Sequence, residues 1–275
     1  MLIDTHLHLI DRGRLSYPWL DGVPALNRDW SLAEYTAAAG RCGITAALHM
    51  EVDTAESDAE AEIGMVAETI QAGLVIGAIA GVRPERPDIA DWLAGLDRKV
   101  VRGLRRVLHV VPDEVSDAPA FRDGLRAIGR AGLSFDLCLR ADQLGRGAAL
   151  ADACPDTRFV LDHCGNPEVA RNGYDDWAAP LAELARRPNV IAKISGLLAQ
   201  TGPEWSVETL RPYVEHVIAS FGWDRVIWGS DWPVVTLGGS LSDWVAATHA
   251  LIQGCSADER AALFHGNARR FWGLA

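Results

Sequence analysis

Four widely separated residues of this chain carry side chains that can act together on a polar bond. His6 and His8 stand two positions apart near the start of the sequence. His163 lies in its second half and Asp231 near its end. Three imidazoles and a carboxylate are a plausible ligand set for one zinc ion. The carboxylate is also suited to act as a general base toward water.

Each of these four residues follows a segment with the composition of a buried strand. On a strand, residues two apart point to the same side, so His6 and His8 are expected to face inward together. An apolar run precedes His163, and Pro233, which lacks an amide donor, ends the strand near Asp231. Functional groups of a parallel barrel gather at the carboxyl ends of its strands, so we expect the four side chains to converge. A hydrogen-bonded core histidine and a helix-capping aspartate are the alternatives.

Further polar residues follow the expected fourth and fifth strands. Arg105 ends the fourth strand and Arg140 the fifth. A guanidinium at a barrel mouth suits a planar carboxylate, which it can hold with two parallel hydrogen bonds. Solvated loop charges are the alternative for both arginines. His109, just after the fourth strand, is a candidate to line the mouth.

Three more residues have undecided roles. Lys193 lies inside the expected seventh strand and is costly to bury unpaired, so we expect it to pair with Asp136 or Asp162. A catalytic amine is the alternative. His49 and Glu51 follow the second strand, where either can complete or flank the site.

The elements that must position these residues recur along the whole chain. Short runs rich in Val, Ile and Leu return about every 30 residues and alternate with longer amphipathic stretches, which is typical of parallel βαβ units. No glycine-rich nucleotide turn follows the first strand, so a closed barrel is favoured over an open sheet. The sequence therefore predicts an α/β fold, a single (β/α)₈ TIM-type barrel. We place its strands at residues 2–8, 44–50, 74–80, 100–105, 134–139, 158–163, 190–195 and 225–230.

The ends of several helices also carry recognisable signals. Ser31 to Glu34 and Ser256 to Glu259 match the capping box, in which each side chain satisfies the other's free backbone amide. Gly43, Gly73 and Gly132 each stand between a helical stretch and the next strand, where a left-handed residue is expected.

The composition indicates the number of domains and excludes some classes of partner. A chain of 275 residues with 49% hydrophobic content suits one barrel domain spanning residues 1–275. The net charge of −11 and the scattered arginines argue against a nucleic-acid partner. The longest uncharged apolar run, Ala72 to Val82, is about half of the ~20 residues that a membrane span needs, so no membrane association is expected. The five cysteines form no CxxC pair, and the chain does not open on a secretory pattern, so a cytoplasmic protein with reduced thiols is expected.

Taken together, six segments resemble the amidohydrolase superfamily, and within it the lactone-hydrolysing branch of the amidohydrolase 2 type. That branch contains sugar lactonases, such as those for L-fuconolactone and L-rhamnonolactone, and 2-pyrone-4,6-dicarboxylate lactonase. The resemblance spans nearly the whole chain, and its motifs are specific to the branch rather than to one substrate. The segments are Asp4–His8, Val101–Arg106, Phe135–Leu139, Leu161–Pro167, Lys193–Leu197 and Gly229–Pro233.

The resemblance implies roles for the candidate residues. The three histidines would surround the scissile carbonyl, directly or through one divalent metal, with zinc the first choice. Asp231 would be the general base, Arg105 would hold a carboxylate or hydroxyl of the substrate, and Trp19 would wall the pocket or pack on the barrel rim. Binuclear members carry a lysine on the fourth strand and a histidine on the fifth. This chain has neither, so two metals are not expected, and some members of the branch work without any metal.

These implications predict a hydrolase that opens the ring ester of a small polar lactone, such as a sugar-acid lactone. Its partner would be this small molecule or the carboxylate formed from it. A metal-dependent decarboxylase, which would use similar positions, is the first alternative. A metal-dependent nuclease fits poorly with the acidic charge balance. A barrel that binds sugar acids without catalysis is the alternative from another class.

Overall fold

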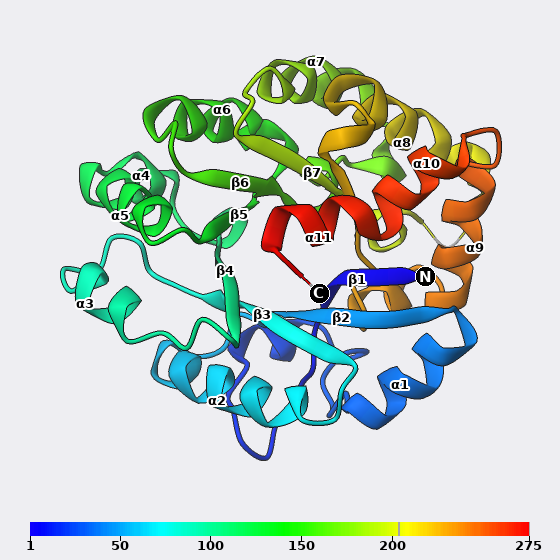
Figure 1. The fold of residues 1–275 in the computed structure, drawn as a ribbon. Helices are drawn as coiled ribbons and strands as arrows, with labels where there is room; N and C mark the ends of the chain where they lie inside the picture. The colour runs from blue at the N-terminus through cyan, green and yellow to red at the C-terminus, as the bar shows by residue number, and fades with distance from the viewer. Residues whose placement is uncertain (203, 275) are drawn as a thin grey trace.

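The computed structural model describes residues 1–202 and 204–274 of the chain. Eight parallel strands form one sheet in which each strand pairs with the next along the chain (Figure 1). The strands are β1 (Leu2–Leu7), β2 (Ile44–Met50), β3 (Val75–Gly81), β4 (Val101–Val107), β5 (Ser134–Cys138), β6 (Arg158–Leu161), β7 (Val190–Ile194) and β8 (Val226–Trp228).

The first and last strands meet at their carboxyl ends. Leu7 forms a parallel bridge with Trp232, whose carbonyl oxygen accepts a hydrogen bond of 2.7 Å from the amide of His8. The amide of Asp231 donates to the carbonyl of His6 at 2.9 Å. These contacts draw the sheet into a nearly closed barrel, and the predicted (β/α)₈ fold is confirmed.

Helices surround the barrel on the outside (Figure 1). Most lie between consecutive strands, as the βαβ pattern predicts, and the last one crosses one end of the barrel. They are α1 (Leu32–Arg41), α2 (Ala59–Ile70), α3 (Ile89–Ala94), α4 (Asp113–Asp117), α5 (Pro119–Arg130), α6 (Leu144–Ala153), α7 (Tyr174–Ala185), α8 (Val207–Phe221), α9 (Leu241–Leu251), α10 (Ala257–Ala261) and α11 (Asn267–Trp272). None of them, within the described residues, combines the length and apolar character needed to cross a bilayer.

The expected helix signals are present. Ser31 and Ser256 cap α1 and α10 with reciprocal capping boxes. Gly43, Gly73 and Gly132 adopt φ angles of 71°, 92° and 71°, which a residue with a Cβ atom adopts only with strain. The chain therefore turns from helix to strand where the glycines indicated.

Two strands end two residues earlier than expected, and β1, β5 and β7 each end one residue earlier. β6 ends at Leu161 rather than residue 163, and β8 ends at Trp228 rather than residue 230. The reason lies in the backbone that follows, because His163 and Asp231 have left-handed φ angles of 53° and 60° that cannot continue a strand. Both candidate residues therefore lie just beyond their strands, in tight turns.

One end of the barrel interior is apolar. Ala268 and Trp272 of α11 pack against side chains from inside the barrel, and the indole nitrogen of Trp272 donates to Ser134 Oγ at 3.0 Å. In Figure 1 this red helix lies across the barrel beside the start of β1. It closes the amino-terminal end of the strands and leaves the carboxyl end for the polar residues. The barrel residues of this cluster are Ile3, Leu48, Met50, Ile79, Val160, Ile191 and Ile227.

Candidate active site

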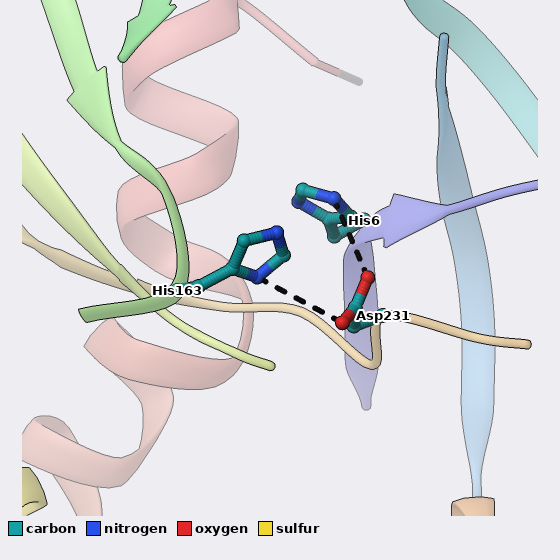
Figure 2. Close-up of side chains that lie close together, drawn as sticks. All are labelled: His6, His163 and Asp231. Carbon is teal, nitrogen blue, oxygen red and sulfur yellow. Dashed lines mark ion pairs between the residues drawn. The ribbon is translucent and has the colours of Figure 1, made fainter. Parts of the chain in front are cut away.

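The structure brings His6, His8, His163 and Asp231 together at the carboxyl end of the barrel. The ring centroid of His6 lies 4.9 Å from that of His8 and 4.3 Å from that of His163. Figure 2 shows His6 and His163 turned toward the Asp231 carboxylate from different elements. All four side chains are buried, with exposures of 8% or less.

The Asp231 carboxylate lies in the middle of the imidazoles. Its Oδ1 atom is 3.4 Å from His8 Nε2 and 3.7 Å from His6 Nε2, and its Oδ2 atom is 4.0 Å from His163 Nδ1. Among the described residues no side chain or amide makes a hydrogen bond to this carboxylate. The carboxylate is therefore available to a small molecule or a cation placed between the rings.

The strained turns at His163 and Asp231 are held by close packing. A Cβ atom on Gly196 would lie 2.5 Å from His163 Nδ1, so this glycine makes room for the imidazole. Ser195 Oγ and His163 Nδ1 share a hydrogen bond of 3.0 Å. Strained backbone of this kind clusters at functional sites, where the surrounding structure keeps it in place.

Asp4 fixes the first strand to the loop that carries Asp231. Its carboxylate accepts hydrogen bonds from the amide of His6 at 3.0 Å, the amide of Ser230 at 2.7 Å and the hydroxyl of Tyr35 at 2.6 Å. The pairing register of β1 with β2 shifts between Asp4 and Leu7. This irregularity lets Ile3 face the apolar interior while His6 faces the polar end.

Burial governs the protonation of the cluster. Desolvation lowers the pKa of all three histidines, and that of His8 falls to about 3. The imidazoles are therefore neutral near pH 7, which is the form that binds metal ions. Burial also raises the pKa of Asp231 to about 6.

Arg105 reaches the cluster from β4, with its orientation set by Glu51. Its Nε donates to Glu51 Oε1 at 2.5 Å and its Nη2 to the Glu51 carbonyl at 2.7 Å. The remaining nitrogen, Nη1, lies 3.4 Å from both His6 Nε2 and Asp162 Oδ2. Glu51 therefore occupies the two nitrogens with which Arg105 was expected to hold a substrate carboxylate. Only the third nitrogen, Nη1, faces the imidazoles.

Lys193 lies beneath the cluster and pairs with both expected carboxylates. Its Nζ donates to Asp136 and Asp162 at 2.7 Å each and lies 3.2 Å from His6 Nδ1. Burial opposes the charge, but the two carboxylates outweigh it and raise the pKa of Lys193. The ammonium is fully buried, so it supports His6 from below.

A cavity of about 240 Å³ opens above the cluster. It is lined by polar groups at its base, among them His8, Arg105, His163 and Asp231, and by apolar walls. Trp19 forms part of the wall, with its indole nitrogen donating to the Val52 carbonyl at 2.7 Å. The expected pocket residue Trp19 is therefore in place.

A wider outer cavity of about 600 Å³ adjoins the first and shares His109 with it. Arg140 lines only this outer cavity. Its exposed guanidinium pairs with Asp142 at 3.0 Å and donates to the His109 carbonyl. The structure therefore places His109 at the mouth, as expected, but does not bring Arg140 into the cluster.

The family model described as amidohydrolase matches residues 3–274, nearly the whole chain. The chain belongs to the amidohydrolase family. Among its relatives are an uncharacterised protein of Sinorhizobium fredii, 32% identical over 98% of both chains, and an L-fucono-1,5-lactonase of Burkholderia ambifaria. The latter is 30% identical over 98% of this chain and 94% of its own. This membership makes the protein a hydrolase, and the resemblance to the amidohydrolase superfamily is confirmed.

A solved amidohydrolase from Burkholderia multivorans, crystallised with bound zinc, has a similar structure. The superposition covers 100% of this chain and 100% of the other, with a TM-score of 0.92 and a sequence identity of 24%. At that identity the likeness shows the barrel fold alone.

In the present chain, two side chains near the cluster have positions that the sequence did not predict. His49 does not line the cavity. Its Nε2 atom lies 3.2 Å from Oε1 of Glu62, with which it pairs. Cys138, the last residue of β5, lies in the cavity with its Sγ 3.4 Å from His109 Nδ1. Its position two residues after the inward-facing Asp136 was the available signal for that thiol.

Proposed function

We propose that this amidohydrolase opens the ring ester of a small polar lactone by attack of water. The observation that carries the proposal is that the Asp231 carboxylate and the neutral imidazoles of His8 and His163 line one cavity, with the buried His6 imidazole packed against them. The lactonase relative supports the same reaction class. The volume of about 240 Å³ suits one small ring with polar substituents.

Asp231 is the proposed general base. With no hydrogen bond from the described residues, its carboxylate is free to accept the proton of a water molecule above it. The water oxygen bonds to the carbonyl carbon, and the ring C–O bond then breaks. The proton held by Asp231 passes to the departing alkoxide, so the product is a hydroxy acid. General-base assistance of this kind contributes about 10²- to 10⁴-fold.

The imidazoles and Arg105 are proposed to stabilise the carbonyl oxygen as it gains negative charge. The Nη1 atom of Arg105 lies 3.4 Å from the Nε2 atom of His6, and Arg105 also lines the cavity. Donors held in place before the reaction need no reorganisation as the charge develops. We place Arg105 in this role rather than in a bidentate grip, because Glu51 already takes its other nitrogens.

The same residues fit one divalent metal. His6, His163 and Asp231 each offer a ligand atom, and these atoms lie within 4.8 Å of one another. His8 is a fourth candidate, because its Nε2 lies 3.4 Å from the same carboxylate. Neutral imidazoles with a carboxylate are ligands that suit zinc. When bound, such a metal polarises the carbonyl and lowers the pKa of its water from 15.7 to about 7. The Burkholderia multivorans amidohydrolase, which shares the barrel fold, was crystallised with bound zinc.

The outer cavity is proposed to admit the substrate. His109 stands where the two cavities join, and Arg140 supplies a positive charge at the entrance for an acidic substrate or product. The proposed partner is therefore a small lactone or carboxylate rather than a macromolecule.

The proposal is tested with a panel of sugar lactones and pyrone dicarboxylates, followed by acid release with a pH indicator. The screen is run with a chelator and again with added zinc. We expect turnover of at least one lactone, with its hydroxy acid as product. Release of CO₂ from an aromatic acid would replace the proposal with a decarboxylase. Binding of sugar acids without turnover of any lactone would indicate a non-catalytic barrel.

A further inference from the structure

Asp53, in the loop that follows β2, lines the inner cavity of about 240 Å³ together with Trp19 and Arg105. Its φ angle of 47° is left-handed, a conformation that Asp and Asn adopt more readily than most residues. Its amide donates to Glu51 Oε2 at 2.8 Å, and the other oxygen of the same carboxylate accepts a hydrogen bond from Arg105 Nε. Glu51 therefore fixes both Asp53 and Arg105 at the wall of the cavity.

The carboxylate of Asp53 has no partner in the part of the chain that the structure describes. Within residues 1–202 and 204–274, no side chain or amide donates a hydrogen bond to it, and no cation forms an ion pair with it. Asp53 also lines a neighbouring cavity of about 510 Å³, to which Arg105 does not contribute. Burial and the charge of Glu51 raise the pKa of Asp53, and Arg105 opposes them more than any other arginine does. The charge of Asp53 therefore acts on the inner cavity.

The inner cavity offers no free positive charge among its described residues. Its one arginine, Arg105, already lies 2.5 Å from Glu51 and 3.4 Å from Asp162. The histidines that line the cavity are neutral near pH 7, because burial lowers their pKa values. Asp53 and Asp231 add two carboxylates to the lining. An anionic group on the substrate would thus be buried beside like charges without a partner, which is strongly unfavourable.

Uncharged hydrogen-bonding groups are present in the same cavity. Asn166 and Gln200 line it, and Gln200 Nε2 donates to Asn166 Oδ1 at 3.2 Å. A carboxylate such as that of Asp53 accepts strong hydrogen bonds from hydroxyl groups. Arg140 lies in the outer cavity and pairs with Asp142, so it does not compensate a negative charge held in the inner one. These groups suit hydroxyl substituents and not carboxylates.

We propose that Asp53 is a specificity-determining residue, which makes the inner cavity accept lactones with hydroxyl substituents and reject lactones that carry a carboxylate. The selection of a substrate for turnover rests on the proposed lactonase function, whereas the selection of a ligand by charge does not. Opening of the lactone ring creates a carboxylate in the cavity. The charge that excludes anionic substrates therefore also favours departure of the hydroxy acid toward the outer cavity.

The proposal is tested with pairs of lactones that have the same ring size and stereochemistry and differ only at the terminal carbon. This carbon is CH₂OH in an aldonolactone and COO⁻ in the corresponding aldarolactone. We expect kcat/KM of the wild-type protein to be at least about 100-fold higher for the aldonolactone, since like charges are strongly unfavourable at close range. Asp53→Asn keeps the side-chain size and the tolerance of a left-handed backbone, and it is expected to reduce this ratio at least about tenfold. A general loss of folded protein lowers both values equally and leaves the ratio unchanged.

The matched control is Asp175→Asn, which changes an exposed carboxylate that lines neither cavity and should keep the wild-type ratio. Equal kcat/KM for the two lactones in the wild-type protein, or an unchanged ratio in Asp53→Asn, would overturn the proposal and leave the lactonase function standing.

Binding of the corresponding lactams, whose ring amide resists hydrolysis, is measured by calorimetry in the same three proteins. The neutral lactam is expected to bind more tightly than the carboxylated one, and Asp53→Asn to reduce the difference. This result in a protein that hydrolyses no lactone would refute the proposed function and leave the selection by charge standing. A protein that neither hydrolyses the lactones nor binds the lactams would overturn both.

Discussion

Glu51 determines where Arg105 points. The carboxylate of Glu51 lies 2.5 Å from Arg105 Nε, and its backbone carbonyl lies 2.7 Å from Nη2. The side chains are almost completely buried, with 5% exposure each. Because two of its three nitrogens are fixed in this way, Arg105 presents its third to the imidazole cluster.

Loss of the Glu51 contact is expected to impair catalysis through Arg105. In Glu51→Gln the guanidinium loses its charged partner and is free to turn away from His6. Misplacement by about 1 Å can reduce a rate by roughly 100-fold, so we expect kcat to fall by up to about that factor. Steady-state kinetics and the melting temperature are measured together. Wild-type kcat in a folded Glu51→Gln protein would contradict the orienting role.

Replacement of the proposed base is expected to stop turnover. Asp231→Asn keeps the size of the side chain but removes its ability to take a proton, which should lower kcat by about 10² to 10⁴-fold. Circular dichroism is expected to match the wild type. Asp123→Asn, which removes an exposed carboxylate paired with Arg126 outside both cavities, is the control. Activity of Asp231→Asn near the wild-type level would remove Asp231 from the mechanism.

Gly196 is expected to tolerate no side chain. Its φ of 70° is strained for any other residue, and a Cβ atom would lie 2.5 Å from His163 Nδ1. Gly196→Ala should therefore destabilise the fold by about 1–2 kcal/mol from the left-handed backbone alone and displace the imidazole. Gly254→Ala, where nothing lies within 4 Å of the added atom, should change neither. Urea unfolding and kcat/KM are measured for both variants, and equal values for the two would refute the packing argument.

The pH profile should report the burial of Asp231. Because burial raises its pKa to about 6, the carboxyl group becomes protonated, and inactive as a base, as the pH falls through that value. In metal-free protein we expect kcat/KM to be flat above pH 6 and to fall tenfold per pH unit below it. A bound cation stabilises the ionised form of Asp231 and should move the acidic decline of kcat/KM to lower pH. A limb near pH 4 in metal-free protein would show that Asp231 is not the titrating group.

Removal of the buried ammonium should unfold the barrel more readily. Lys193→Met leaves Asp136 and Asp162 buried without their shared partner, and loss of one member of a buried pair typically costs 3–5 kcal/mol. Lys99→Met, which changes an exposed lysine, is the matched control. Denaturant midpoints compare the two, and a midpoint for Lys193→Met equal to that of the control would contradict the structural role.

The fold was predictable because its signals are local. Apolar runs, capping boxes and glycines each act within a few residues, and β2 begins and ends where they indicate. The ends of β6 and β8 were not predictable. They depend on the left-handed turns at His163 and Asp231, which the surrounding packing imposes.

The candidate site was predictable in part. Convergence of the four cluster residues follows from strand alternation and from the rule that parallel strands end together. The partner of Arg105 was not predictable, because it comes from another strand and depends on how two long side chains fill the barrel. The direction of Arg140 depends on its loop, where alternation gives no information.

The cavity combines two kinds of wall with different freedom to change. The ionic groups at its base belong to strands or to the turns directly after them, whereas Trp19, Val110 and Val234 come from connecting loops. Loop exchange between barrels leaves strand geometry largely intact. New substrate preferences can therefore be engineered by grafting these loops, while the strands and turns that carry the acid–base groups stay unchanged.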